Sequence, residues 1–391
     1  MGVLLPQDLQ AAELTAGINR FGLNLTQKLS AGDGDNLTLS APSISFALSM
    51  AAEGAAGQTR EEIYHLLNFD TPGEAAPGPK QMQLLETLLA GDTGVRLHVA
   101  NSLWLQENFP FVTGFIDRAR RFYGAEVDAV DFRDPATADR INSWVHEQTG
   151  GNIKQIADED AIRELVSMIL NAVYFDGQWQ KEFDPDRTKP LPFYSAQKTE
   201  DTVPTMRREG NFPYLKNESL QAVSLPYGEG RFTMDLYLPA KDTPVEEFME
   251  ELEVEKIQNW QKNMRRENVE VKLPRFQIEY EENLNQILKE MEMQAAFDRH
   301  EADFSRMVRL DEITENIFID FVKHKSYVEV DEEGTEAAAV TGIGIGVTAV
   351  EPEPPTIHFD RPFFFIIRDT RTDLHLFTGT VNNIPTNQPA N

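Results

Sequence analysis

Apolar side chains recur at helical spacing through the first ninety residues of the chain. The pattern predicts helices over residues 9–29, 42–56, 60–67 and 81–90. Thr59 stands in the position of an N-cap for the third of these helices. The stretch 70–80 contains three prolines and two glycines and predicts a loop. The N-terminal part is therefore expected to be mainly helical.

Farther along the chain, alternation and short apolar runs become the commoner pattern. They predict strands over 95–105, 126–132, 165–175, 269–280 and 317–330, with three more near Ile357, Phe365 and Leu376. Helices are expected at 111–123, at 135–148 with Asp134 as N-cap, and in the acidic stretch 245–256. The run 165–175 lacks polar alternation, which is typical of a strand covered on both faces.

Helices concentrated early and strands concentrated late favour an α+β fold over regular βαβ winding. No repeat and no Ser- or Gly-rich linker divides the chain. We therefore expect one domain spanning residues 1–391.

The segment from Asp331 to Pro355 conflicts with its surroundings. At period two, one face carries small and β-branched side chains: Thr335, Ala337, Ala339, Thr341, Ile343, Ile345 and Val347. The other face carries Glu336, Ala338, Val340, Gly342, Gly344 and Gly346. Alternating glycines weaken an isolated strand, and the prolines at the end cannot continue a ladder. The pattern is thus compatible with a strand inside a sheet and with an exposed glycine-rich loop.

Charge and composition exclude several functions. The sequence has 36 basic and 64 acidic residues, a net charge of -28, which disfavours binding to nucleic acid or anionic membranes. There is no cysteine, so disulfides, thiol catalysis and thiolate metal sites are excluded. The seven histidines lack ligand spacing, so no metal site is expected. Gly342–Gly346 fails the dinucleotide-binding spacing and no G-x-S-x-G motif occurs, so we expect neither an enzyme nor a cofactor.

No apolar stretch is long enough to span a membrane, and the first residues lack the features of a signal peptide. The compartment is therefore expected to be cytoplasmic, or extracellular if a leader was removed.

Several long motifs resemble those of the serpin family, in the family's order. Glu332-Glu-Gly-Thr-Glu-Ala-Ala-Ala339 is similar to its reactive-loop hinge. Asn171-Ala-Val-Tyr-Phe-Asp-Gly-Gln-Trp179 and Val271-Lys-Leu-Pro-Arg-Phe276 resemble central-strand motifs. Phe359-Asp-Arg-Pro-Phe-Phe-Phe365 and Leu376-Phe-Thr-Gly-Thr-Val381 resemble its C-terminal signature.

The resemblance implies three β-sheets surrounded by helices, with a reactive loop at about 332–355 exposed above the largest sheet. It implies a monomeric suicide inhibitor of serine proteases. A protease would attack the loop and form an acyl-enzyme, and the cleaved loop would enter the sheet as an added strand. The trapped protease would be distorted, so that its ester is not hydrolysed.

The resemblance also assigns roles to single residues. The hinge is formed by Glu332, Glu333, Gly334, Thr335, Glu336, Ala337, Ala338 and Ala339. A polar cluster under the point where the sheet opens comprises Ser40, Ser43, Asn171 and His324, and Trp179 matches an aromatic plug at the top of the sheet. For His324, a structural role in the core is the competing interpretation. The family usually has proline directly after the first serine, whereas this chain has Ala41 and then Pro42.

The reactive bond is expected between Thr348 and Ala349, by counting forward from Glu332. Counting back from Phe359 points to Glu351, and Val347 and Val350 are further alternatives. No Lys or Arg lies between Lys325 and Arg361, so a trypsin-like protease has no basic side chain to bind. The small residues favour an elastase-like or subtilisin-like target.

Two further expectations concern partners. The stretch 80–92, which corresponds to the heparin-binding helix of some family members, has one basic and two acidic residues, which argues against heparin binding. The alternative to inhibition is a non-inhibitory carrier, chaperone or storage protein, or a mere protease substrate. The intact hinge, with Gly334 and Thr335, favours inhibition.

Overall fold

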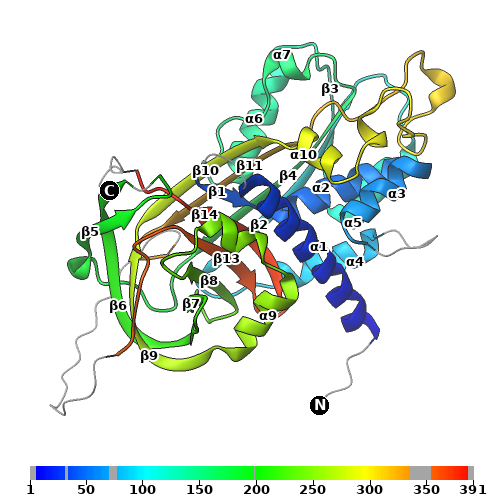
Figure 1. Ribbon diagram of the computed structural model, residues 1–391. Coiled ribbons are helices and arrows are strands. Elements are labelled where there is room, and N and C mark those ends of the chain that lie inside the picture. Colours follow the sequence, from blue (N-terminus) through cyan, green and yellow to red (C-terminus); the bar gives the residue numbers. More distant parts are fainter. Residues whose placement is uncertain (1–5, 31–33, 70–76, 198, 335–353, 386–391) are drawn as a thin grey trace.

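Helices α1 to α5 gather at one end of the molecule, and the long strands β6 and β9 lie toward the opposite end (Figure 1). The computed structural model describes residues 6–30, 34–69, 77–197, 199–334 and 354–385. Its α-helices are α1 Pro6–Ser30, α2 Ala41–Gly54, α3 Gly57–Leu66, α4 Gly78–Leu88, α5 Thr113–Tyr123, α6 Ala136–Gln148, α7 Glu159–Ile162, α8 Val245–Glu250, α9 Val254–Asn263 and α10 Asn285–Glu290. Short 3₁₀ turns occupy Pro185–Arg187, Ala295–Phe297 and Leu310–Glu312.

The strands of the described residues form three sheets. Their bounds are β1 Leu37–Leu39, β2 Val95–Gln106, β3 Glu126–Val130, β4 Ser167–Gly177, β5 Lys189–Tyr194, β6 Glu200–Lys216, β7 Leu220–Pro226, β8 Phe232–Pro239, β9 Arg265–Pro274, β10 Phe276–Asn283, β11 Lys323–Val330, β12 Thr356–His358, β13 Phe363–Asp369 and β14 Leu374–Val381. A nine-stranded sheet runs β1-β14-β13-β8-β7-β6-β9-β12, with β5 paired to β6. A three-stranded sheet runs β3-β2-β4, and β10 pairs with β11. The expected α+β fold with three sheets and surrounding helices is confirmed.

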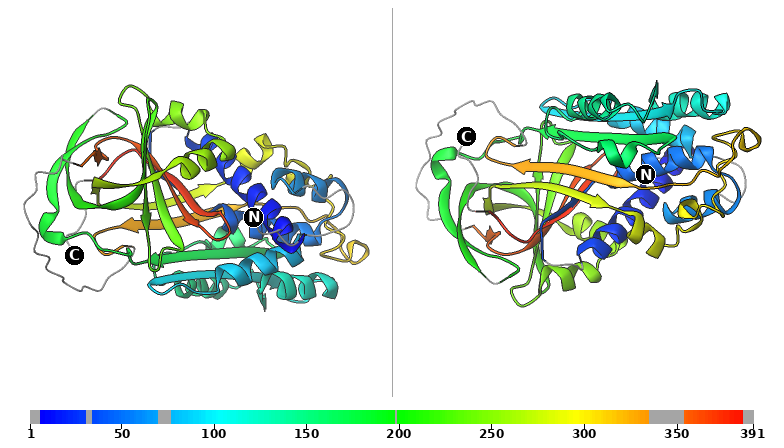
Figure 2. Two further views of the ribbon diagram at one scale, coloured as in Figure 1. Left: turned by 90° about the horizontal axis from the view of Figure 1, so that it is seen from below. Right: turned by 90° about the horizontal axis from the view of Figure 1, so that it is seen from above.

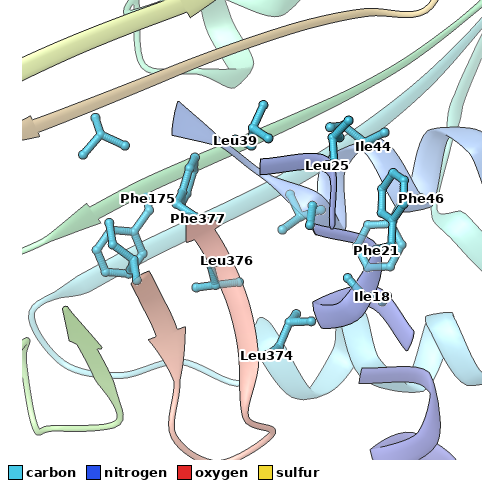
Figure 3. Close-up of a cluster of buried hydrophobic side chains, with 14 of the residues drawn as sticks. Ile18, Phe21, Leu25, Leu39, Ile44, Phe46, Phe175, Leu374, Leu376 and Phe377 are labelled. Atoms are coloured by element: carbon cyan, nitrogen blue, oxygen red, sulfur yellow. The ribbon is translucent and has the colours of Figure 1, made fainter. Parts of the chain in front are cut away.

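The main core lies where α1 and α2 cover the C-terminal strands. Figure 3 shows Phe21 of α1, Phe46 of α2 and Leu376 of β14 among the side chains that meet there. Every residue of β14 is buried, which explains why the C-terminal motif is so apolar. Burial of this surface is the main stabilising contribution to the fold.

Strand β4 is covered on both faces, as its apolar sequence predicts. Ile169 and Val173 face the main core, whereas Met168, Leu170 and Ala172 on the alternate face pack in a cluster with α6. Its neighbour on one side is β2, and the register runs from Val95 opposite Gly177 to Leu105 opposite Ser167.

Three predicted elements are shorter or more broken than expected. The strand predicted over 317–330 is regular only from Lys323, because the preceding residues line a cavity and have no partner strand among the described residues. The strand predicted over 269–280 is interrupted at Arg275, between β9 and β10. The acidic helix predicted over 245–256 is two helices, α8 and α9, separated by residues 251–253.

Two smaller expectations are also wrong. Thr59 lies inside α3 and does not cap it; its hydroxyl instead accepts a hydrogen bond from the Asp303 amide at 2.9 Å. The predicted loop over 70–80 overlaps α4, which begins at Gly78 because proline is tolerated in the first turn of a helix. Residues 70–76 lie outside the described residues. No helix in the described part of the chain is both long and apolar enough to cross a membrane.

Candidate functional site: a hinge above an opening between two sheets

The last described residues before the predicted loop form a turn at the end of β11. Asp331 Oδ1 accepts hydrogen bonds from the amides of Glu333 at 2.9 Å and Gly334 at 3.1 Å. Gly334 then forms an isolated antiparallel bridge with Gln178, directly after β4. The turn therefore places Gly334 beside the end of β4.

Gly334 is required by this geometry. Its φ is +135°, a value that side chains disfavour. A Cβ there would lie 2.1 Å from the carbonyl oxygen of Gly177 and 2.7 Å from the Cα of Gln178. Only glycine lets the hinge approach the end of β4 this closely.

Glu332 anchors the hinge from below. Its side chain is buried, and Oε1 accepts hydrogen bonds from Arg275 Nη2 at 2.6 Å and from the Thr188 hydroxyl. Its carbonyl accepts a hydrogen bond from the Phe183 amide at 2.8 Å. The carboxylate is thus held by a cation and a hydroxyl, as a buried charge requires.

Trp179 fastens the other side of the turn. Its indole Nε1 donates to the Asp331 carbonyl at 2.9 Å, and its amide donates to the Glu333 carbonyl at 2.9 Å. The ring stacks on Tyr227 with centroids 4.3 Å apart and an interplanar angle of 9°. The predicted plug residue therefore contacts the hinge directly.

Below this turn, β4 and β11 separate. Among the described residues, the Gln178–Gly334 bridge is the one ladder contact that joins the three-stranded sheet to the β10–β11 pair. A cavity of about 890 Å³ opens between β4 and residues 312–325, and α2 lies at its base. Figure 2 shows β4 and β11 as neighbouring ribbons that run side by side without joining. We call this space the opening.

The predicted polar cluster lies at the opening as two separate pairs. The Ser40 amide donates to His324 Nε2 at 3.3 Å. The Ser43 hydroxyl donates to the Asn171 carbonyl at 3.3 Å, and Asn171 Nδ2 donates to Asn101 Oδ1 at 2.7 Å. Within the described residues, Ser40 Oγ and Asn171 Oδ1 are buried without a hydrogen-bond partner.

Helix α2 and His324 show why the cluster holds together. Ser40 is extended, with φ -106° and ψ 96°, and α2 starts at Ala41 with proline in its first turn, so the shifted proline is accommodated.

Burial lowers the pKa of His324 to about 4. His324 is therefore neutral near pH 7, which its role as acceptor from Ser40 requires.

Some residues of the site were not identified from the sequence. Arg275 and Thr188 hold Glu332, and Tyr227 supports Trp179. Arg275 lies within the motif Val271–Phe276, and that motif is the sequence feature that could have identified it as a site residue. The predicted hinge residues Thr335–Ala339 and the predicted reactive bond, with its alternatives over 347–351, lie outside the described residues. No cluster able to hold a metal ion occurs in the part of the chain that the structure describes.

The fold and site define a class of protein in which a tight turn lies at the end of a central strand, beside an opening between two sheets. The family model for serpin (serine protease inhibitor) matches residues 16–384. The chain is 34% identical to Iripin-2 of Ixodes ricinus over 96% of this chain and 94% of the relative. It is 32% identical to leukocyte elastase inhibitor of Xenopus tropicalis, over 94% and 98% respectively.

Solved structures agree with this match. The native state of the thermophilic serpin tengpin superimposes with a TM-score of 0.83 at 27% identity, over 98% of this chain and 96% of that one. Human thyroxine-binding globulin complexed with thyroxine gives a TM-score of 0.85 at 25% identity, over 96% and 99%. This chain belongs to the serpin family. Serpins are generally non-enzymatic inhibitors, so the expectation that the protein is not an enzyme is confirmed.

Proposed function

We propose that this protein is a suicide inhibitor of serine proteases that traps the acyl-enzyme by inserting its cleaved loop beside β4. The observation that carries the proposal is the antiparallel bridge between Gly334 and Gln178. It already forms the first pair of the ladder that insertion would extend, above an opening of about 890 Å³.

The bridge sets the register of that ladder. If each further loop residue pairs with the preceding residue of β4, Thr335 lies opposite Gly177 and Ile345 opposite Ser167. Directly opposite residues of an antiparallel pair point to the same face. Ala339 and Ile343 would therefore join Val173 and Ile169 against the main core. The apolar face of the loop matches the buried face of the opening.

The same register bears on the reactive bond. Thr348 and Ala349 lie beyond Ile345, so cleavage there releases every residue that can pair with β4. Among the described residues, β2 is the one strand that pairs with β4. Because insertion would add a second partner, the uncleaved state would be held by a barrier and not by greater stability.

Small side chains at 347–350 and the absence of Lys or Arg from 326 to 360 support an elastase-like or subtilisin-like target. The likeness to a leukocyte elastase inhibitor supports the same class. The likeness to a thyroxine-binding globulin structure keeps a carrier function as the second candidate. The strict requirement for glycine at 334 supports inhibition, because this turn brings the chain to the end of β4, where insertion would start.

The test is to mix the protein with pancreatic elastase and to run a denaturing gel. We expect a stable band at the summed masses, and sequencing of the released fragment should place the cut after Thr348. Thr335→Arg is the matched control, because a charged side chain at the start of insertion should stall it and leave cleaved protein without the band. Complete cleavage of the unaltered protein without that band would establish it as a substrate.

A further inference from the structure

Helices α2, α3 and α5 meet at the helical end of the molecule (Figure 1). Glu53, in the last turn of α2, is fully buried there. Its Oε2 lies 2.9 Å from Nε of Arg118 on α5, and its carbonyl oxygen accepts a hydrogen bond from Arg118 Nη2 at 2.8 Å. Arg118 thus neutralises the buried carboxylate and satisfies a carbonyl at the end of α2. These two contacts account for the presence of this arginine.

A loop from a distant part of the chain, residues 303–306, lies against the turn between α2 and α3. The Asp303 amide donates to the Thr59 hydroxyl at 2.9 Å, and the Arg306 amide donates to the Gly54 carbonyl at 3.1 Å. The backbone of Arg306 is therefore fixed beside the end of α2.

Two arginines at this place lack an acidic partner. Arg60 Nε donates to the Tyr64 hydroxyl at 3.2 Å, and the Arg60 guanidinium lies 5.0 Å from the centroid of the Tyr64 ring. Within the described part of the chain, neither Arg60 nor Arg306 forms an ion pair, and the Arg306 side chain has no hydrogen bond. The nearby carboxylate of Asp303 instead accepts a hydrogen bond from the Ser305 amide at 3.0 Å. Both arginines are partly buried, so water solvates them incompletely.

The charges at this place act on one another. Burial, and after it the charges of Arg60 and Arg118, lower the pKa of Arg306. Burial, and after it the charge of Glu53, raise the pKa of Tyr123, whose hydroxyl is buried without a hydrogen-bond partner among the described residues. Three guanidinium groups therefore lie near one buried carboxylate, in a chain whose net charge is -28. An anion is the component that would balance them.

We propose that Arg60 and Arg306 hold a small phosphate-type oxyanion beside the end of α2. Guanidinium groups donate paired hydrogen bonds to such oxygens, and hydrogen bonds between two ionised groups are the strong ones. The bound anion would also offset the repulsion among the three guanidinium groups. The net charge of -28 would repel a long polyanion, so a small ligand fits best. The inference does not depend on the proposed function.

The experiment follows thermal unfolding of the full chain against inorganic phosphate, with sodium chloride added to keep the ionic strength constant. We expect a saturable rise in the unfolding temperature, because a ligand that binds the native state stabilises it. Arg306→Gln should raise the apparent Kd for phosphate at least about tenfold. Arg309→Gln is the matched control, because it removes the same charge from the same segment, where Arg309 pairs with Glu312 at 2.8 Å. It should change the Kd less than about twofold.

A second arm distinguishes two sources of the oxyanion. Glycerol phosphate is titrated in the same way as inorganic phosphate. Tighter binding of glycerol phosphate supports a site for the phosphate of a small ester, and tighter binding of inorganic phosphate supports a site for the free ion. Stabilisation by a long sulfated polysaccharide, without stabilisation by either small anion, would overturn the proposal.

The unliganded variants separate a binding role of Arg306 from a structural one. Because the Arg306 side chain has no hydrogen bond or ion pair within the described residues, Arg306→Gln should not lower the unfolding temperature in the absence of phosphate. A structural role would lower it. A ³¹P NMR titration gives an independent measure of binding, in which the unaltered protein should broaden the phosphate signal and Arg306→Gln should not. No stabilisation beyond that by sodium chloride, or equal effects of Arg306→Gln and Arg309→Gln, would overturn the proposal.

Discussion

Glu332 and Arg275 are joined by a 2.6 Å ion pair at the point where the hinge leaves β11. The carboxylate is 5% exposed and the guanidinium 34% exposed, so the anion is the partner that depends on the pair. A buried carboxylate without its cation is costly, whereas an exposed cation without its anion is solvated. The ion pair therefore stabilises the charge of Glu332 more than that of Arg275.

Arg275→Ala should lower the free energy of unfolding by about 1–3 kcal/mol, a range reduced for the partial exposure of Arg275. Urea unfolding at pH 7 measures the change. Arg309→Ala is the control, because Arg309 pairs with Glu312 at 2.8 Å with both side chains about half exposed. The control should cost about 0.5 kcal/mol or less. Equal losses in the two variants would contradict the anchoring role of Arg275.

Acid should weaken the fold through His324. The pKa of His324 is about 4 in the native state, against about 6.5 for a solvated histidine, so the unfolded chain binds the proton first as pH falls. Stability is therefore fully present above pH 6.5 and declines as the pH approaches 4, by up to about 1.4 kcal/mol per pH unit. Protonation would also turn Nε2 into a donor facing the Ser40 amide.

Thermal unfolding between pH 7.5 and 4.5, compared with His324→Gln, isolates this contribution. His375, whose pKa is lowered by burial to about 3, contributes equally to both proteins and cancels in the difference. His65, 76% exposed at its side chain, supplies the control His65→Gln, which should follow the unaltered protein. A His324→Gln variant with the same pH dependence as the unaltered protein would count against the assignment.

Gly334→Ala should destabilise the hinge by more than the usual cost of a positive φ. A Cβ at this position meets the Gly177 carbonyl at 2.1 Å, whereas Gly91, with φ +78°, has no atom within 4 Å. Gly91→Ala should therefore lose about 1 kcal/mol from backbone strain alone, and Gly334→Ala clearly more. Chemical denaturation measures both. Similar losses would mean that the close approach of Gly334 to β4 carries no energetic weight.

Thr348→Arg should convert the protein into a trypsin inhibitor, if the reactive bond follows residue 348. The change supplies the basic side chain that the loop lacks between Lys325 and Arg361. The rate of trypsin inhibition should rise at least about a hundredfold. Glu351→Arg is the comparison, and it should be cleaved without trapping. Trapping by Glu351→Arg and not by Thr348→Arg would move the reactive bond to the alternative position.

The periodic elements could be predicted from the sequence because their signals are local. Strand β4 was expected over 165–175 and lies at Ser167–Gly177. The absence of a regular strand over residues 317–322 could not be predicted, because this stretch has the composition of a strand but no partner strand within the described residues. Strand propensity reflects how well side chains fit a pleated, half-buried surface. A ladder forms only where a neighbouring strand is present to pair with.

The site was predictable to the extent that motifs identify its parts. The resemblance placed Ser40 and His324 in one cluster although they are 284 positions apart, and the structure joins them by a hydrogen bond. It did not reveal Arg275 as the partner of Glu332, because the charge pattern gives many possible cations for each acid. It also named the four residues as one cluster, whereas their hydrogen bonds divide them into two pairs.

Under the proposed mechanism, one strand enters the opening beside β4 and does not leave. Inhibition by such a protein is then counted in molecules and not described by an equilibrium constant. Each copy removes one protease and is spent, so protective capacity is the molar amount present. A tissue or a preparation that relies on this inhibitor must replace it by new synthesis, because washing or dilution does not regenerate the spent molecules.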